Sequence, residues 1–529
     1  MKQRYVRGSA LLFSLLVLAG CAVGPDYEKP AVATPAAYKE AGVTTPANLP
    51  AHEAGTWKAA TPSEDALRGE WWKIFGDPAL DALEAEALQA NQNLQAAVAR
   101  LQQARALQRD ARSDYFPRVD AGFGPTRQRP SPASQGLADD APSSANTLWR
   151  GQASVAYEAD LFGRVSRNVE AASADAQASE ALYRSVLLAL QADVAQAYFQ
   201  VREFDAESRL FRQTVSLREE SLQLIQRRYD AGDISELDLA RAKSELASAQ
   251  SQSLGVDRQR AVAEHALAVL LGKTPAEFTM PALPLAPVLV QIPAGLPSTL
   301  LERRPDIAAA ERAMAAANAR IGVAKSAFFP RLDITGAFGY ESSSLGNLFE
   351  WSSRTFLLGP LVGAALSVPI FDGGRRQAGV DRARAVYEED VAQYRQTVLN
   401  AFREVEDNLA NLRILADQTR VQDSAVDSAA RAARISRTQY REGSISYLDV
   451  IEADRTVLTQ QRVSVQLSGE RARSAVALVR ALGGGWDTPL PSATPQARTG
   501  DTPAETPAET PAARQPQAQV AGDTRLARR

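Results

Sequence analysis

The sequence predicts a mainly helical protein that also contains strands of the membrane-spanning type. Three observations lead to this fold class. A long unit occurs twice in the chain, alanine-rich segments carry apolar residues at the period of an α-helix, and a few short segments alternate apolar with polar residues as strands do. We therefore expect two similar halves, each with long helices and a β-hairpin.

The internal repeat is the strongest of these signals. The segment Tyr115-Phe116-Pro117-Arg118 returns as Phe328-Phe329-Pro330-Arg331. Farther along, the offset is a constant 211 residues: Tyr229, Gly232, Asp238 and Gly272 correspond to Tyr440, Gly443, Asp449 and Gly483. A copy this long exceeds the roughly 20–50 residues of a solenoid unit, so each half should build the same substructure once.

Residues 1–20 have the features of a secretory signal peptide. A basic start is followed by an apolar core from Gly8 to Ala19, which is too short to span a bilayer comfortably. Small residues then precede Cys21, the only cysteine of the chain. This start resembles a bacterial lipoprotein signal, cleaved before Cys21 and lipidated on its sulfur, and Ala22 favours sorting to the outer membrane. An ordinary secretory signal beside an unmodified thiol is the alternative.

Composition excludes several classes of function. The net charge is −3, which gives no basis for nucleic-acid binding. No window after residue 20 contains 18 uninterrupted apolar residues, so no transmembrane helix is predicted. Any crossing of a membrane must then use strands.

Each predicted element of the first half has a local reason. Asp77-Pro78 should cap and start a helix that runs to about Ser113. Strands are predicted at Tyr115 to Gly124 and at Trp149 to Leu161, where odd positions are apolar or aromatic and even positions are mostly polar. A helix of roughly 99 Å should follow from Arg164 to Tyr229, and Gly232 should end it before a second helix over 235–271.

The second half repeats this plan. We expect a helix from about Ser298 to Ala327, strands at Phe329 to Tyr340 and Phe356 to Phe371, a helix from Gly374 to Tyr440, and a returning helix from Ser446 to Leu482. The predicted segments are the signal peptide (1–20), an extended segment (21–75), repeat one (76–273), a connector (274–297), repeat two (298–486) and a disordered tail rich in Pro, Ala and Thr (487–529).

The strands predict an assembly of several chains. Spanning a membrane takes about 9–11 residues per strand, and four such strands cannot close a barrel when the known minimum is about eight. An open edge in lipid would leave backbone groups unpaired, so copies of the chain should complete the barrel, and three copies would give twelve strands. In each half, two short helices stacked end to end would match one long helix, as in the wall of a hollow cylinder.

Other interpretations of the same patterns remain open at this point. Long heptad-like helices alone would suit a coiled-coil spacer, and strands alone would suit an ordinary soluble sheet. The hairpins between the helices argue against the spacer. The aromatic face, the polar loops and the lipoprotein start favour a membrane sheet.

Several motifs, together with the duplication, are similar to the TolC-like family of outer membrane efflux proteins, in its lipoprotein, NodT-type branch. They are Cys21-Ala22-Val23-Gly24-Pro25-Asp26-Tyr27, Tyr157-Glu158-Ala159-Asp160-Leu161-Phe162-Gly163-Arg164, Arg303-Arg304-Pro305-Asp306-Ile307, Val368-Pro369-Ile370-Phe371-Asp372-Gly373-Gly374, and the two Tyr-x-x-Gly-x-x-Ser turns. The resemblance implies a homotrimer with a twelve-stranded barrel in outer membrane lipid and a periplasmic α-helical tunnel closed at its far tip. It also implies work with a periplasmic adaptor and an inner-membrane pump of the RND (resistance-nodulation-division) type.

The tunnel tip is where functional residues are expected. The two turns, Gly232, Asp233 and Ser235 in one half and Gly443, Ser444 and Ser446 in the other, lie farthest from the strands and should face the adaptor. Just past the second turn, Asp449, Glu452 and Arg455 follow at intervals of three and so lie near one helix face. Repeated around a threefold axis, this face would form a carboxylate ring that selects cations.

The resemblance adds further residues to this gate. It implies that Tyr440, Asp449, Glu452 and Arg455, with Asp238, form links and acidic constrictions, and that Leu448 forms an apolar one. Some relatives carry arginine where this chain has Ile445, so the link should run through Arg455 or Arg441. Ordinary surface pairs at these positions are the alternative interpretation.

No catalytic machinery is expected. The two histidines, His52 and His265, are not spaced like the ligands of a metal site or the members of a catalytic triad. The sequence also contains neither a Cys/His cluster nor a phosphate-binding loop. We expect no cofactor, and energy must come from a partner. The leading hypothesis is an efflux duct for drugs, toxic compounds or metal ions. A duct for type I protein secretion and a non-conducting envelope coiled coil are the alternatives.

Overall fold

A computed structural model describes residues 23–30, 35, 38–40, 69–138, 140–285, 304–358 and 364–484. All of the described residues belong to one compact unit of the chain, which ends at Asp487. The predicted signal peptide, Cys21 and the predicted tail lie outside the described residues, as do Arg303 and residues 286–297 of the connector. The segment boundaries given above stay predictions.

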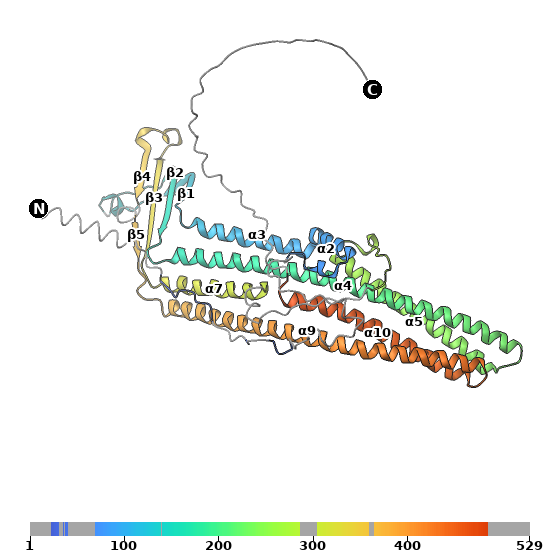
Figure 1. Cartoon of the computed structure of the whole chain (residues 1–529). Coiled ribbons are helices and arrows are strands. Elements are labelled where there is room, and N and C mark those ends of the chain that lie inside the picture. The colour runs from blue at the N-terminus through green and yellow to red at the C-terminus, as the bar shows by residue number, and fades with distance from the viewer. Residues whose placement is uncertain are drawn as a thin grey trace, which may run out of the picture. The chain divides into compact units, whose positions relative to one another are not determined.

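The first half is built around one long helix. It contains α2 (Pro78–Ala90), α3 (Gln92–Ser113), α4 (Arg164–Asp230) and α5 (Glu236–Leu270). α4 has 67 residues and packs against α3 near the strands and against α5 near the far end (Figure 1). Leu188, Val194 and Val201 form part of its apolar face, which is buried in the largest core cluster together with Trp71, Trp72 and Leu267.

The second half repeats this arrangement. It contains α7 (Pro305–Ser326), α9 (Arg375–Arg441) and α10 (Tyr447–Ala481), and both shorter helices pack along α9. The halves are joined because α4 also packs against α7 and α10. The turns α4–α5 and α9–α10 lie together at the end of the helices farthest from the strands (Figure 1). Short 3₁₀ segments occur at Trp71–Phe75, Ala133–Gln135, Pro275–Glu277, Leu345–Asn347 and Trp351–Ser353.

The structure differs from the prediction in the first helix of each half. The single helix predicted from Asp77 to Ser113 is wrong: Asn91 is extended and separates α2 from α3, because its side chain caps α3 by accepting a hydrogen bond from Leu94 N at 3.0 Å. In the second half, α7 begins at Pro305 and not at Ser298, and residues 298–303 lie outside the described residues. Arg304 is extended, as expected for a residue before proline.

The short helices meet end to end at an equivalent joint in both halves. Asn91, the N-cap of α3, donates from Nδ2 to the carbonyl of Leu270 at the end of α5, at 2.8 Å. Arg304, the N-cap of α7, donates from Nη1 to the carbonyl of Ala481 at the end of α10, at 3.1 Å. Asn91 and Arg304 are corresponding positions of the repeat, as are Leu270 and Ala481. The duplication has therefore preserved the joint but changed the side chain that makes it.

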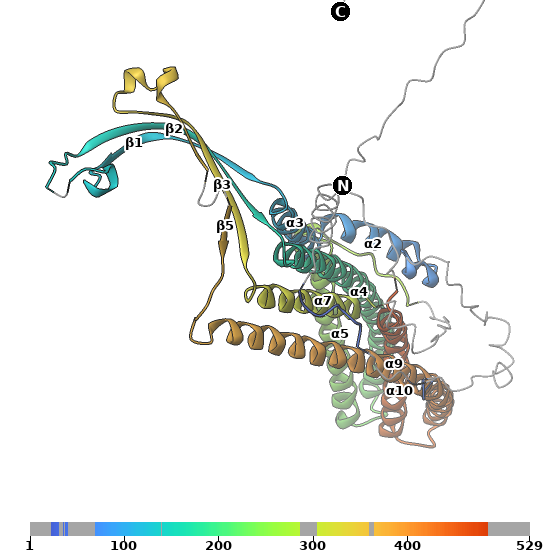
Figure 2. The same ribbon diagram turned by 90° about the vertical axis from the view of Figure 1, so that its left-hand side faces the viewer.

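The strands of both halves form one antiparallel sheet. Its path is β1 (Arg118–Gln128), β2 (Asn146–Ala159), β3 (Arg331–Ser342) and β4 (Arg354–Leu358), with β5 (Ala364–Ser367) also paired to β3 (Figure 2). β2 and β3 bring the two halves together, with Val155 opposite Gly336 and Tyr157 opposite Ile334. β1 is left with one unpaired edge in the described part of the chain.

The last predicted strand, Phe356 to Phe371, is wrong as a single element. β4 and β5 pair with successive stretches of β3, and the chain from Val368 to Phe371 is not a strand. Pro369 has no amide hydrogen for a strand ladder, which accounts for the early end.

One face of the sheet is apolar and exposed. Val119, Phe123, Phe338 and Phe356 are all exposed, and Phe338 lies opposite Phe356 in the register. In the described part of the chain, the helices include none that is both long and apolar enough to cross a membrane.

The described residues among 23–40, here called the N-terminal strap, lie against both halves. Val23 N donates to the carbonyl of Phe162 at 3.2 Å. Gly24 has a φ of +133°, and a Cβ there would sit 2.7 Å from the Cα of Gly322, so only glycine allows this backbone approach to α7. At the other end, Lys39 N and Glu40 N donate to the Glu406 carboxylate at 2.7 and 2.9 Å.

Candidate functional site

The two helix turns have the same backbone geometry. Gly232 and Gly443 adopt left-handed φ values of 78° and 76°. Asp233 N donates to Arg228 O at 2.9 Å, and Ser444 N donates to Gln439 O at 2.8 Å. These bonds satisfy carbonyls that a helix end leaves free. The glycines predicted to turn the chain therefore do so in both halves.

A serine starts the returning helix in each half. Ser235 caps α5 through Asp238 N, and Ser446 caps α10 through Asp449 N. In the second half the cap is reciprocal, because the Asp449 carboxylate also accepts from Ser446 N at 3.0 Å and Ser446 Oγ at 2.7 Å. Asp449 therefore has a local role in the cap and does not contact Glu452 or Arg455 in any described hydrogen bond or ion pair.

The two turns share a small apolar core. It buries Ile225 and Leu239 from the first half with Tyr447, Val450 and Ile451 from the second, and Tyr440 packs against it. The Tyr440 and Tyr447 rings lie 5.5 Å apart, and the Arg228 guanidinium lies 5.3 Å from the Tyr440 ring. Burial raises the pKa of Tyr440, and the nearby Asp238 raises it further, so this phenol stays protonated at physiological pH.

Arg455 makes a polar link between the halves at the tip. Its Nε donates to Glu245 Oε1 on α5 at 3.0 Å and its Nη2 donates to the same oxygen, while Nη1 reaches Glu452 at 3.2 Å. The Glu245 side chain is 9% exposed and that of Arg455 is 56% exposed. The hydrogen bond to Glu245 raises the pKa of Arg455, so this guanidinium stays charged at physiological pH.

Behind this link is a charged network that the sequence analysis did not identify. Arg218 of α4, only 6% exposed, lies 3.6 Å from Glu245 of α5 and 3.5 Å from Asp454 of α10. Arg437 of α9 completes it by donating to Asp454 at 2.7 Å. The network therefore joins all four helices that reach the tip.

The sequence did contain a signal for this network. Phe211, Arg218 and Ile225 are spaced by seven residues along α4, and both apolar members are almost fully buried. An arginine at a core position of such a stripe needs a buried partner. Its partners, however, are 27 and 236 residues away in the sequence, so spacing alone could not name them.

The predicted gate residues are thus partly brought together. Tyr440 and Asp238 are near each other, and Glu452 and Arg455 form the predicted pair. Leu448 is 40% exposed in the first turn of α10. Asp238 accepts from Ser235 Oγ at 3.2 Å and from Arg241 at 3.5 Å and is not part of the Arg455 link.

The polar links of the tip are of two kinds. Arg455–Glu245 and Arg218–Asp454 join different helices, whereas Arg455–Glu452 lies within α10. Within the described ranges, no group of three or more His, Cys, Asp or Glu side chains could hold a metal ion.

Comparison with known proteins shows which family has this architecture. The model of the family described as outer membrane efflux protein matches residues 83–273 and 296–484. The chain is similar to the outer membrane protein OprJ of Pseudomonas aeruginosa, with 36% identity over 90% of this chain and 96% of that protein. It is also similar to the toluene efflux pump outer membrane protein TtgF of Pseudomonas putida, with 35% identity over 89% and 95% of the two chains. The solved structure of the outer-membrane channel OprN superposes with a TM-score of 0.78 at 31% identity, covering 88% of this chain and all of that one. The chain therefore belongs to the outer membrane efflux protein family.

Proposed function

We propose that the protein is the outer membrane duct of a tripartite efflux system, which receives small molecules from an inner-membrane RND pump through a periplasmic adaptor. The observation that carries this proposal is a helical tip whose helices are joined by polar links, at the far end of the helices from an apolar-faced sheet. The names of the relatives, among them a toluene efflux pump component, support small toxic compounds as the exported class. The duct itself is a passive conduit without catalysis.

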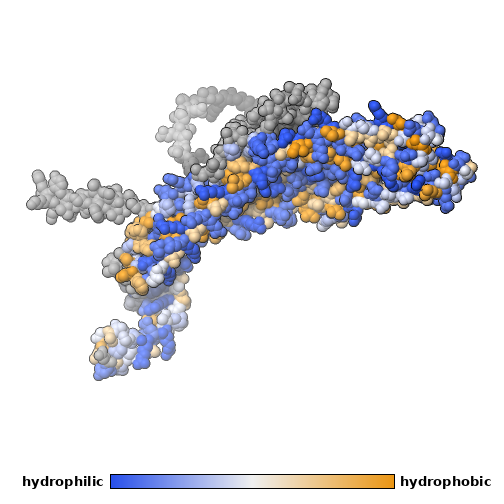
Figure 3. All heavy atoms as spheres, turned by 90° about the horizontal axis from the view of Figure 1, so that it is seen from below, coloured by the Kyte–Doolittle hydropathy of each residue, from blue (hydrophilic) through white to orange (hydrophobic). Residues whose placement is uncertain are grey.

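Three copies of the chain form the working duct. The sheet supports this because an unpaired β1 edge cannot remain open in lipid. The helices support it because α5 exposes Val262 and Val269, and α9 exposes Ile414 and Val421, at the seven-residue spacing of helix contacts. Figure 3 shows apolar surface, in orange, among hydrophilic surface along the helices. A neighbouring copy would cover these residues.

The gate consists of the tip links. Closure rests on Arg455 with Glu245 and Glu452, on the packing of Tyr440 beside Asp238, and on the exposed Leu448. An exposed link contributes about 1 kcal/mol or less, so several must break together when an adaptor docks. In three copies, Glu452 and the capping Asp449 would surround the axis with carboxylates and favour cations.

The adaptor would contact the turns themselves. Gly232, Asp233 and Ser235, and Gly443, Ser444 and Ser446, offer two similar exposed turns per chain. Cys21 would carry acyl chains in outer membrane lipid. An acyl anchor attaches a chain to one leaflet, so the sheet must supply the pore.

A duct for type I protein secretion is the second candidate, because the same closed tip would serve it. The lipoprotein start favours efflux. Loss of the gene should sensitise cells to small toxic compounds in the efflux case and should abolish export of one protein in the secretion case.

Two measurements test the proposal. Detergent-solubilised protein should have about three times the monomer mass, and a stable monomer with a closed barrel would contradict the assembly. In planar bilayers, Tyr440→Phe combined with Arg455→Ser should raise the conductance, and Glu452→Ala should weaken cation selectivity. Unchanged values in both variants would move the gate to the Leu448 ring.

A further inference from the structure

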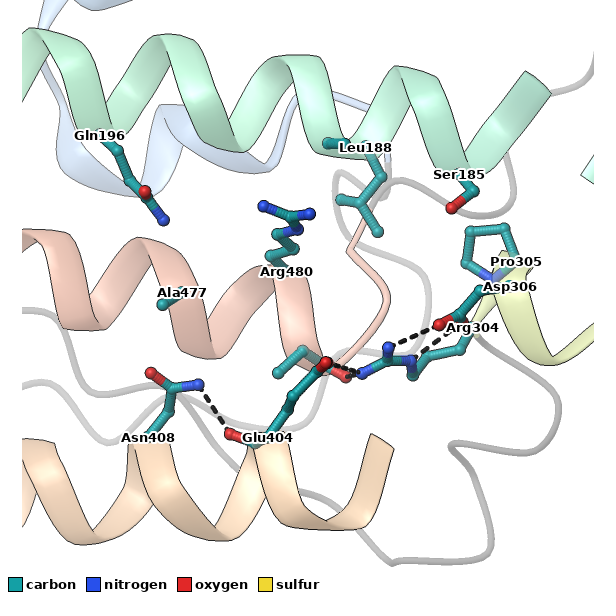
Figure 4. Close-up of a pocket in the computed structure, with 12 residues that line it drawn as sticks. Ser185, Leu188, Gln196, Arg304, Pro305, Asp306, Glu404, Asn408, Ala477 and Arg480 are labelled. Atoms are coloured by element: carbon teal, nitrogen blue, oxygen red, sulfur yellow. Dashed lines mark hydrogen bonds and ion pairs between the residues drawn. The ribbon is translucent and has the colours of Figure 1, made fainter. Parts of the chain in front are cut away.

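Arg304 holds three helices together at the joint between α7 and α10. Its guanidinium donates to both carboxylate oxygens of Asp306 at 3.0 and 2.6 Å, to Glu404 of α9 at 2.6 Å, and to the carbonyl of Ala481 at 3.1 Å (Figure 4). The side chain is 9% exposed. A planar group with five donors can serve three acceptors from different directions, which a lysine ammonium on a flexible stem does not do with fixed geometry.

The packing beside this joint is open. A cavity of about 390 Å³ lies next to Arg304 and is lined by α4, α9, α10 and the start of α7, including Gln196, Asn408 and Arg480 (Figure 4). The end of α10 packs through Leu478 and Ala481 in one core cluster and through Val476 and Val479 in another, while Ala477 and Arg480 face this cavity. Apolar packing holds the sides of the helix, and Arg304 adds the polar contact that holds its last turn at the carbonyl of Ala481.

The equivalent joint of the first half is made differently. Asn91 is neutral and connects only to Leu270 O and the start of α3. The backbone there is also tight, since a Cβ on Gly272 would collide with the carbonyl of Ala90. This joint is held by backbone contact, and it ends the helix pair that does not carry Leu448, Glu452 and Arg455.

We propose that Arg304 is a positioning residue for the gate, because it fixes the end of α10 opposite the tip. The inference rests on the proposed function of the tip as a gate. α10 has 35 residues, or about 52 Å, and a tilt of about 2° at the joint would move its other end by about 2 Å. Such a shift is enough to break a hydrogen bond of the Arg455 link.

The test measures where α10 lies and what the pore conducts. A nitroxide is attached at Thr459→Cys on α10 of the full-length trimer, where Cys21 is the only other cysteine and is predicted to be acylated. Distances between the three labels are measured by pulsed electron paramagnetic resonance, and conductance is measured in planar bilayers. Arg304→Lys keeps the positive charge but loses the planar guanidinium that serves three acceptors. Asn91→Ala, at the corresponding position of the first half, is the matched control.

We expect Arg304→Lys to broaden the label distances by a few ångströms and to raise the conductance at least about threefold. Glu404→Gln, which keeps an acceptor oxygen but removes the negative charge of one of the three acceptors, should show a smaller change of the same kind. Asn91→Ala should leave the label distances and the conductance at their wild-type values, even if it lowers the melting temperature as much as Arg304→Lys does.

Three results would overturn the proposal. These are unchanged label distances in Arg304→Lys, an equal change in Asn91→Ala, or unchanged distances in Glu404→Gln if Arg304→Lys does not assemble. A shift in the labels without a change in conductance would support the role of Arg304 in positioning α10 and would instead contradict the gate at the tip. The two ideas therefore fail separately.

Discussion

The two helix turns keep one backbone but carry different charges. Gly232 and Gly443 have nearly the same φ, and a serine caps the returning helix in both halves. One turn later the copies diverge: Arg241, Ser244 and Glu245 of the first half correspond to Glu452, Arg455 and Thr456 of the second. Both copies have kept the left-handed glycine and the capping serine that the turn needs. The charged side chains one turn farther along α5 and α10 differ between the copies.

This divergence makes the tip link one-sided. Arg455 of the second half pairs with Glu245 of the first. The contact related to it by the duplication would join Ser244 to Thr456, and these side chains cannot form an ion pair. The duplication thus supplies the Arg455–Glu245 pair once per chain and not twice, beside the pair of Arg218 with Asp454.

The largest effect is expected from Glu245→Gln. It removes the charge that the buried Arg218 and Arg455 both use, and should destabilise the closed tip by about 2–4 kcal/mol. Conductance in planar bilayers should rise and the melting temperature should fall. Thr456→Val at the corresponding position should leave the conductance unchanged and should change the free energy of unfolding by no more than about 0.5 kcal/mol. Similar effects in the two variants would contradict the one-sided link.

The shared backbone predicts a smaller and equal effect in both halves. Gly232→Ala and Gly443→Ala each place a Cβ in a left-handed conformation, which costs about 1 kcal/mol. Thermal unfolding of the two variants in detergent should give the same shift. If one shift were more than twice the other, the turns would not be equivalent.

The caps should differ slightly. Asp449→Ala removes the carboxylate that accepts from Ser446 N and should cost about 1 kcal/mol, whereas Asp238→Ala removes one that accepts only the Ser235 hydroxyl within its cap and should cost about half as much. Equal losses in thermal unfolding would mean that the Asp449 side chain adds nothing to the cap. Asp449→Asn, which keeps the acceptor oxygen, is the control.

The local parts of the tip were predictable from sequence. Glycine in a Tyr-x-x-Gly-x-x-Ser pattern indicates a left-handed residue and a following cap, and the structure has both. Asp449 was predicted to share a charged face with Glu452 because the spacing allows it. Its carboxylate instead bonds to Ser446, since a capping partner three residues away is available without any tertiary contact.

The long-range parts were not predictable. Spacing places Arg455 on a face of α10 but does not identify Glu245, which is 210 residues away. The break at Asn91 has a local part, the cap on Leu94 N, and a long-range part that the sequence does not show, the bond to the carbonyl of Leu270 at the end of α5. The sequence does not say which distant residues are in contact. The duplication gives part of this information, because it indicates which segments of the two halves occupy equivalent places.

The N-terminal strap has a consequence for the order in which the protein folds. The backbone amides of Lys39 and Glu40 donate to Glu406, which lies 367 and 366 residues later in the chain. These bonds cannot form until α9 is present and folded. Contacts between such distant positions form slowly because a very long loop must close first. The contacts of Lys39 and Glu40 with Glu406 are therefore among the last to form, and α9 must fold before this end of the strap can dock.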